Sequence, residues 1–363
     1  MHERGRWRRV LRWLKRILLG LLALLLLALV AGAIYEALGR RDAERTHPPR
    51  GQMVDVGGRK MHIDCRGTGS PTVIFESGLG TGGTIDWTLV HDRIASFTRA
   101  CAYDRAGIMW SEPKGTPQRA AAVADDLHAL LKGAGITDRL VLVGHSIGGP
   151  YTRTYVGKYG DGVAGLVMVD TSHPDQVARL GKVARTDADP RKVAWIMHSA
   201  KALAWTGAVR LAMAKAGQGK LPRDAAARMA AYASLSVNGA TAELDGFGAT
   251  MDDARTVRSF GNRPLIVLTA MAPFKPAELK GLGIKASDGA RFKQEWRRLG
   301  AEQAALSTRG RQQVVADAGH YIQIDRPDVV IAAVREVVDE VRAGGDGLNN
   351  GVAGQATTDR EME

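Results

Sequence analysis

The segment with the clearest chemical meaning is GHSIGG at residues 144–149, which has the pattern G-x-S-x-G. A short apolar stretch at 140–143 precedes it, and a helical pattern at 151–159 follows it. A serine at the sharp turn between a strand and a helix exposes its hydroxyl, and the N-terminus of that helix stabilises nearby negative charge. The pattern therefore predicts that Ser146 is a nucleophile. The competing interpretation is a glycine-rich turn with an incidental serine.

A serine hydroxyl is a weak nucleophile unless a base accepts its proton. Of the nine histidines, His320 has the most suitable position, between a predicted strand at 312–316 and a predicted helix at 327–341. Loops at the carboxyl ends of parallel strands lie on one edge of the sheet, where Ser146 is also expected. We therefore expect His320 to be the base, with a structural histidine as the alternative.

The elements that would position these residues alternate between strand and helix. Two β-type segments at 53–56 and 60–64 predict a hairpin, and short apolar strands follow at 72–75, 100–103, 140–143, 163–169, 264–269 and 312–316. Helical patterns lie between most of them, which predicts a mostly parallel sheet covered by helices on both faces. Residues from 171 to about 262 interrupt the alternation with Ala- and Met-rich helical patterns, and we interpret them as a cap.

Four segments carry a resemblance to a known family: FESGLG at 75–80, YDRAG at 103–107, GHSIGG at 144–149 and AGHY at 318–321. Together they resemble the α/β-hydrolase superfamily over residues 52–342. The resemblance implies an α/β fold with an eight-stranded, mostly parallel sheet, helices on both faces and a helical cap. It also implies a serine hydrolase, of carboxylesterase or lipase type, that cleaves an ester or related acyl bond through an acyl-enzyme intermediate.

The resemblance also suggests which residues assist Ser146. The turn after the third strand usually supplies one oxyanion-hole amide, which corresponds to Leu79, and the residue after the nucleophile supplies the other, Ile147. In most relatives the acid of the triad follows the seventh strand, where this sequence has no nearby carboxylate. Some lipases carry it after the sixth strand, where Asp170 lies, so we expect Asp170 to be the acid and Asp288 to be the second candidate. The YDRAG segment is expected to be structural.

The resemblance leaves alternatives open. The same triad serves acyltransferases and amidases, and a catalytically silent, ligand-binding relative is a further candidate. Epoxide hydrolases and haloalkane dehalogenases of this fold use a carboxylate nucleophile, and the serine at position 146 argues against both. We expect a small-molecule ester or acyl substrate, with lipids among the candidates. We expect no cofactor and no metal, since the sequence has no H-E-x-x-H, paired C-x-x-C or phosphate-loop motif.

An uncharged apolar stretch at residues 17–35 follows a basic head at residues 1–16. As a helix it would extend roughly 28 Å, which nearly matches the hydrocarbon core of a membrane. We expect a transmembrane signal anchor at 17–38, with the head cytoplasmic, a linker at 39–51 and the catalytic domain on the extracytoplasmic side. The alternative is a signal peptide cleaved near 31–33, which would yield a secreted protein.

The net charge of +12 at first suggests nucleic acid, but its distribution argues against such a partner. The head carries seven basic residues and one acidic residue, which accounts for +6, and the remaining basic residues are scattered. The tail at 343–363 is Gly-, Asn- and Asp-rich and is expected to be disordered. In the superfamily's usual strand order Cys65 and Cys101 lie on neighbouring strands, so they form either a disulfide or two buried thiols.

Overall fold

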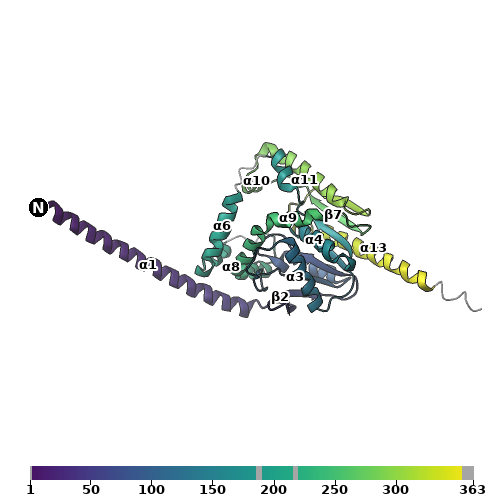
Figure 1. Cartoon of the computed structure of the whole chain (residues 1–363), viewed down its shortest axis with the longest axis horizontal. Coiled ribbons are helices and arrows are strands. Elements are labelled where there is room, and N and C mark those ends of the chain that lie inside the picture. Colours follow the sequence, from purple (N-terminus) through teal and green to yellow (C-terminus); the bar gives the residue numbers. More distant parts are fainter. Residues whose placement is uncertain (1, 185–189, 216–219, 354–363) are drawn as a thin grey trace, which may run out of the picture.

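The computed structural model describes residues 2–184, 190–215 and 220–353, and its centre is one eight-stranded sheet (Figure 1). The strands are ordered β1-β2-β4-β3-β5-β6-β7-β8, and only the pairings of β2 with β1 and β4 are antiparallel. The fold class predicted from the sequence is thereby confirmed. The strands are β1 (Gln52–Asp55), β2 (Lys60–Arg66), β3 (Thr72–Glu76), β4 (Ala100–Tyr103), β5 (Leu140–His145), β6 (Val163–Val169), β7 (Leu265–Ala270) and β8 (Gly310–Val315).

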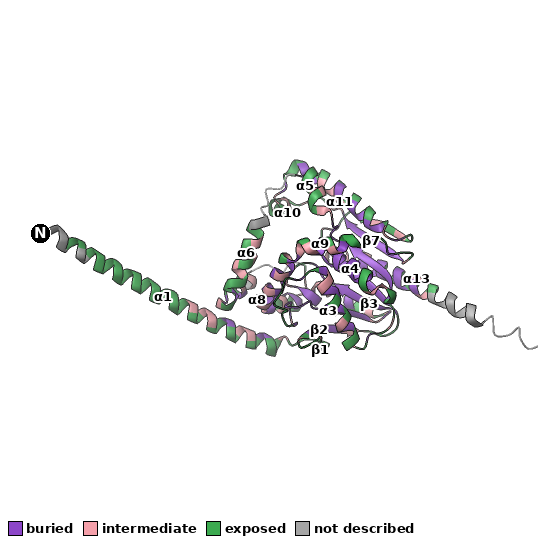
Figure 2. Ribbon diagram, viewed as in Figure 1, coloured by how far each residue is buried: buried purple, intermediate pink, exposed green. Residues whose placement is uncertain are grey.

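Both faces of the sheet are buried, which explains why its inner strands are mostly apolar (Figure 2). In β5, Val141 and Val143 belong to one core, whereas Leu140 and Leu142 belong to the core on the opposite face. Each fully buried side chain of this size contributes roughly 1.5–3 kcal/mol relative to an exposed one. The inner strands therefore have no solvent-facing side that would call for polar residues.

Helices pack on both faces of the sheet. Helices α2 (His91–Ala95) and α13 (Pro327–Ala353) contribute to the core that contains Val141. Helices α3 (Ala120–Gly133) and α4 (Gly148–Tyr159) contribute to the opposite core, and α11 (Gly289–Ala304) packs on β7 and β8. Shorter elements complete the core domain: η1 (Gly83–Trp87), η2 (Gly160–Gly162), α10 (Pro276–Leu282), η4 (Ala286–Asp288) and α12 (Ile322–Asp325).

A group of helices is inserted between β6 and β7, as the interruption of the alternation predicted. Its longest member, α8, has Tyr232 in a small apolar cluster with Ile108 and Met109 of the core domain. The backbone N–H of Met109 also donates to Ser236 Oγ of α8, at 2.8 Å. The helices of this cap are α5 (Gln176–Val183), α6 (Pro190–Leu203), η3 (Ala204–Thr206), α7 (Ala208–Lys215), α8 (Arg223–Asp245) and α9 (Phe247–Thr256).

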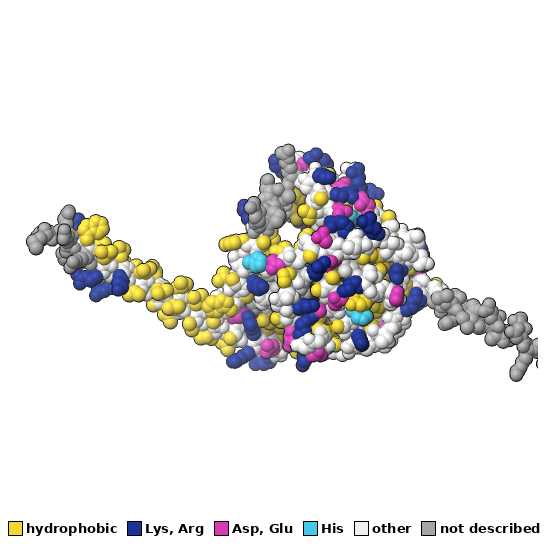
Figure 3. Space-filling model, viewed as in Figure 1, with side chains coloured by type: hydrophobic (Ala, Val, Ile, Leu, Met, Phe, Trp, Pro, Cys, Tyr) yellow, Lys and Arg dark blue, Asp and Glu magenta, His cyan; other side chains and the backbone are white. Residues whose placement is uncertain are grey.

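The N-terminal helix α1 (His2–Thr46) extends away from the domain and is long and apolar enough to cross a membrane (Figure 1). Hydrophobic side chains follow it up to the point where it meets the rest of the protein (Figure 3). The structure differs from the expected linker at 39–51, because residues 39–46 are still helical. Glu36 on this part of α1 is buried and accepts hydrogen bonds from Arg210 Nε at 2.9 Å and Ser234 Oγ at 2.6 Å. The polar end of α1 is thus held against the cap.

Two further expectations concern the C-terminal tail and the two cysteines. Helix α13 continues to Ala353, so the first part of the tail expected to be disordered is helical, and residues 354–363 lie outside the described residues. Cys65 of β2 and Cys101 of β4 are register partners on adjacent strands and form a disulfide. The bond was one of two alternatives left open by the sequence.

Candidate active site

Ser146 occupies the sharp turn between β5 and α4. Its φ angle is +54°, a left-handed conformation that is strained for a non-glycine residue. The turn closes tightly, because a Cβ on Gly144 would lie 2.8 Å from the carbonyl oxygen of Gly148. A Cβ on Gly148 would lie 2.4 Å from the carbonyl oxygen of Glu76 on the neighbouring strand. The two glycines of the motif therefore allow the close approach that holds Ser146 in its strained position.

The structure brings together three of the predicted site residues. His320, in the loop after β8, has its Nε2 3.0 Å from Ser146 Oγ. Its Nδ1 lies 2.7 Å from Oδ2 of Asp170, which directly follows β6. With the proton on Nδ1 donated to Asp170, Nε2 is free to accept the Ser146 hydroxyl proton. The imidazole is about 44% exposed, so the pair can be reached from outside.

Asp170 is held from its other side by donors that the sequence did not reveal. Its Oδ1 accepts a hydrogen bond from the Ala270 N–H at 2.8 Å and another from Trp296 Nε1–H at 2.7 Å. Asp170 itself is buried and has a φ angle of +44°. Each carboxylate oxygen therefore has its own fixed partners, and the one facing His320 is oriented by the other two bonds.

The second candidate acid lies elsewhere. Asp288 precedes α11, and its carboxylate accepts a hydrogen bond from Arg291 one turn further along the chain. Glu278, the first carboxylate after β7, caps α10 by accepting the Lys275 N–H at 2.7 Å. Both are accounted for by the helix termini beside them, and His320 bonds to Asp170.

The two predicted oxyanion-hole residues flank Ser146. Ile147 is buried and precedes the first turn of α4, and Leu79 belongs to the turn after β3. This turn passes close to the nucleophile, since a Cβ on Gly78 would lie 3.2 Å from Ser146 Cβ. The Gly78 carbonyl accepts a hydrogen bond from Arg105 Nη2 at 2.8 Å. In a trans peptide the N–H points opposite to the carbonyl, so the Leu79 N–H is directed away from Arg105.

Arg105 is the centre of a buried ionic cluster beneath this turn. It donates to Glu76 of β3 at 2.6 Å and, through Nε and Nη2, to both carboxylate oxygens of Glu243 on cap helix α8. Burial would lower the pKa of Arg105, but the two carboxylates raise it well above its usual value. The sequence assigned the YDRAG segment no chemistry. Its arginine nevertheless connects the cap with the turn that carries Leu79.

His145, the spacer of the serine motif, also has a function that the sequence did not indicate. Its Nε2–H donates to the backbone carbonyl of His320 at 3.0 Å. Burial lowers the pKa of His145 well below its ordinary value, and the nearby His320 lowers it further, so the ring stays neutral. His145 thereby supports the loop that carries the predicted base.

Asp86 lies in η1, which follows the Leu79 turn. Burial raises its pKa to about 7, and Arg105 opposes this shift while Asp104 and Glu243 add to it. A carboxyl group with such a pKa changes charge near neutral pH, unlike an ordinary aspartate. Asp86 therefore makes this region sensitive to pH.

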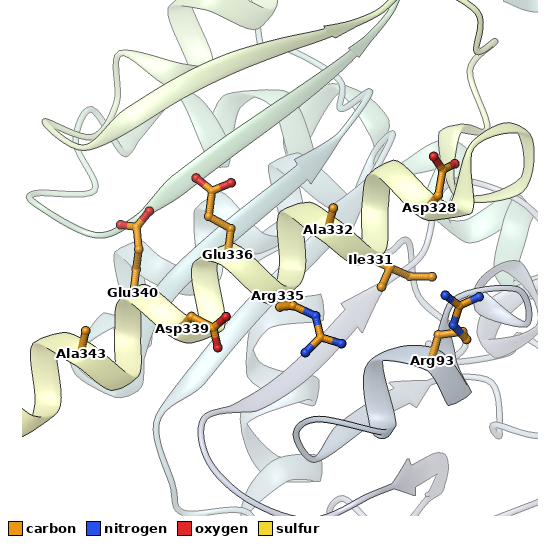
Figure 4. A pocket seen from close by; sticks show the side chains of 9 residues that line it. All are labelled: Arg93, Asp328, Ile331, Ala332, Arg335, Glu336, Asp339, Glu340 and Ala343. Atoms are coloured by element: carbon orange, nitrogen blue, oxygen red, sulfur yellow. The ribbon is translucent and has the colours of Figure 1, made fainter.

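A hollow of about 720 Å³ lies on the outer side of α13 and shares no residue with the Ser146 site (Figure 4). It is open and is lined by charged side chains such as Arg93, Arg335 and Glu340. Arg335 stacks on Phe97 at 3.9 Å, and Glu340 pairs with Arg309. These contacts account for its charged lining without a ligand.

Comparison with known proteins gives matches to part of the chain. A family model described as "alpha/beta hydrolase fold" matches residues 71–196. A probable transporter, efuK, of Hormonema carpetanum is 32% identical over 139 residues, which cover 36% of this chain and 19% of that protein. An uncharacterized protein, YbdG, of Bacillus subtilis is 26% identical over 164 residues, which cover 45% and 50%. This chain thus spans from about a fifth to a half of the length of these curated relatives.

Solved structures match over a larger part of the chain. The thermophilic esterase of Thermogutta terrifontis has a TM-score of 0.54 and 21% identity, covering 80% of this chain and 99% of that chain. The epoxide hydrolase CorEH also has a TM-score of 0.54, with 17% identity, covering 80% and 98%. At such identities the likeness concerns the fold, and enzymes of different chemistry share it.

Proposed function

The chain has the α/β-hydrolase fold, and on this premise we propose that it is a serine hydrolase that cleaves a carboxylic ester or related acyl bond. The observation that carries the proposal is the continuous chain of contacts from Ser146 Oγ to His320 Nε2 and from His320 Nδ1 to Asp170 Oδ2. A serine at the strained turn, in place of a carboxylate, favours acyl transfer over epoxide opening.

In the proposed reaction, Ser146 Oγ attacks the substrate carbonyl while His320 Nε2 accepts its proton. The Leu79 and Ile147 amides donate to the oxyanion that forms, and the N-terminus of α4 adds favourable electrostatic potential. His320 then protonates the leaving group, which departs and leaves an acyl-Ser146 ester. Water, deprotonated by His320, cleaves this ester and restores the free serine. Asp170 stabilises the imidazolium in both halves of the cycle.

We further propose that α1 anchors the protein in a membrane with the basic head on the cytoplasmic side. The apolar length of α1 and the clustering of Arg and Lys before it support this arrangement. The Cys65–Cys101 disulfide supports an extracytoplasmic location of the domain, because such bonds persist in oxidising compartments.

A fluorophosphonate probe tests the catalytic proposal directly. The full chain in detergent should react with the probe, and Ser146→Ala should not. Thr154→Ala, which removes another hydroxyl of the same helix region, serves as a matched control and should react like the wild type. An unreactive wild-type protein with an intact fold would refute the serine hydrolase and favour a ligand-binding function. A panel of esters, amides and acyl acceptors then separates hydrolase, amidase and acyltransferase.

A further inference from the structure

The cap exposes several large apolar side chains. Four of them are on α6, the last at its C-terminal end, and one each is on η3 and α7. Together we call these residues the cap apolar face: Val193, Trp195, Ile196, Leu203, Trp205 and Leu211. Trp195 is 71% exposed and Trp205 is 50% exposed. Exposed apolar groups of this size indicate an interaction surface.

The cap apolar face adjoins the apolar part of α1. Helix α1 and the cap touch at Gly32, where a Cβ would lie 2.4 Å from the Thr206 carbonyl oxygen of η3. A Cβ on Gly207 would lie 2.6 Å from the Tyr35 ring, and the ion pair of Arg210 with Glu36 fixes the next turn. In the space-filling view, hydrophobic side chains run along α1 and also cover the neighbouring edge of the cap, in the region of α6 (Figure 3). The apolar surface is therefore continuous from helix to cap.

The depth of this contact can be estimated from the helix itself. The uncharged stretch of α1 ends at Tyr35, and Gly32 precedes it by three residues, or about 4.5 Å along the helix axis. Amphipathic helices that lie in a membrane surface are buried roughly 5–10 Å into the boundary between headgroups and acyl chains. Thr206, and Trp205 beside it, are thus near the shallow end of this range when α1 spans the bilayer.

The charges of the same segment match this location. Residues 190–215 contain no Asp or Glu and five Lys or Arg residues, four of them besides Arg210, which is buried in its ion pair with Glu36. Basic amphipathic helices with tryptophan on their apolar side bind the surface of membranes that contain anionic lipids. We propose that the cap apolar face lies in the lipid headgroup region of the membrane that α1 crosses, on the side of the domain. The inference rests on the membrane anchor proposed above.

Nitroxide labels can measure this depth in the full chain, reconstituted in vesicles of phosphatidylcholine with a minor fraction of phosphatidylglycerol. The two native cysteines are bonded to each other, so an introduced cysteine is the sole free thiol. Labels at Ile196→Cys and Trp205→Cys test the cap, and Val177→Cys, 67% exposed on α5, is the aqueous control. Leu24→Cys reports whether α1 is inserted.

We expect the ratio of collisions with oxygen to collisions with a soluble nickel chelate to be roughly threefold or more higher at the two cap positions than at Val177. Equal ratios at these three positions, with Leu24 in lipid, would overturn the proposal for the cap alone. An aqueous Leu24 would refute the membrane anchor, and with it the proposal. Fluorophosphonate labelling of Ser146 is measured separately, so that a failure of the serine hydrolase proposal is distinguished from a failure of the membrane proposal.

A second measurement needs no thiol and only conservative substitutions. In vesicles with lipids brominated near the headgroup, the wild type should lose a larger share of its tryptophan fluorescence than Trp195→Phe/Trp205→Phe. The tryptophans of α1 contribute equally to both proteins, so the difference reports the cap. Equal losses would overturn the proposal even if the cysteine variants misfold.

Discussion

Replacing Asp170 by asparagine gives a sharp test of the proposed triad, because the structure determines how the new amide is oriented. Oδ1 of Asp170 faces two donors, Ala270 N–H and Trp296 Nε1–H, and Oδ2 faces His320 Nδ1. In the variant the single carbonyl oxygen must remain toward the two donors. The opposite orientation would leave both donors unsatisfied, the buried Ala270 N–H at a cost of about 1–3 kcal/mol and the partly buried Trp296 N–H at a smaller one.

The NH₂ group of the variant therefore points at His320. Nδ1 then has to accept a hydrogen bond, so the imidazole proton moves to Nε2, the atom that faces Ser146. A protonated Nε2 cannot accept the hydroxyl proton, and the triad loses its base. A wrong tautomer of this kind lowers kcat by about 10⁴-fold, which corresponds to about 5.5 kcal/mol of transition-state stabilisation.

The assay is the rate of fluorophosphonate labelling together with ester hydrolysis, both with the full chain in detergent. Asp288→Asn is the matched control, since Asp288 bonds to Arg291 in another part of the domain, and its rates should stay within about twofold of the wild type. Unchanged far-ultraviolet dichroism of both variants excludes unfolding. An Asp170→Asn protein that retains more than about a tenth of the wild-type rate would refute this account of the triad.

Three further perturbations test other features. Arg105→Lys keeps the charge but loses the forked donors that hold the Leu79 turn, so kcat should fall about 100-fold with little change in KM. A large rise in KM with an unchanged kcat would contradict the positioning function assigned to Arg105. Removing the disulfide with Cys65→Ala/Cys101→Ala opens a loop with a sequence separation of 36 and should lower the free energy of unfolding by about 4 kcal/mol. Denaturant titration measures this change, and an unchanged unfolding midpoint would contradict the predicted stabilisation by the disulfide. Because the pKa of Asp86 is raised to about 7, the folded state holds a proton between about pH 4 and 7 that the unfolded state releases, so stability should decline as pH rises through this range. Asp86→Asn should flatten that decline, and an identical slope in the variant would show that another group titrates.

The sequence was most informative where the determinants are local. The uniformly apolar residues 163–169 predicted strand β6 with its observed bounds, because a strand buried on both faces has no polar positions. The serine turn could also be predicted, because its strand, glycines and helix lie within some twenty consecutive residues. His320 followed from its place after a strand and before the final helix.

The remaining features depend on partners far away in the chain. Asp170 could be favoured over Asp288 only by analogy, because its orienting donor Trp296 lies 126 positions later. The segment after residue 38 appeared polar and linker-like, although α1 continues into it as far as Thr46. Its helix is supported at Glu36 by Arg210, 174 positions away, and no pattern within the segment shows this pairing.

The close attachment of α1 to the cap has a mechanical consequence for the whole protein. A transmembrane helix joined through a flexible linker adapts to a thicker or thinner bilayer by tilting alone, at a modest cost per ångström of mismatch. Here the Glu36–Arg210 ion pair and the Gly32–Thr206 contact couple the tilt of α1 to the tilt of the catalytic domain. With α1 in the membrane as proposed, bilayer thickness would set the angle at which the Ser146 site faces the lipid surface, so membranes of different composition would present different parts of their surface to this site.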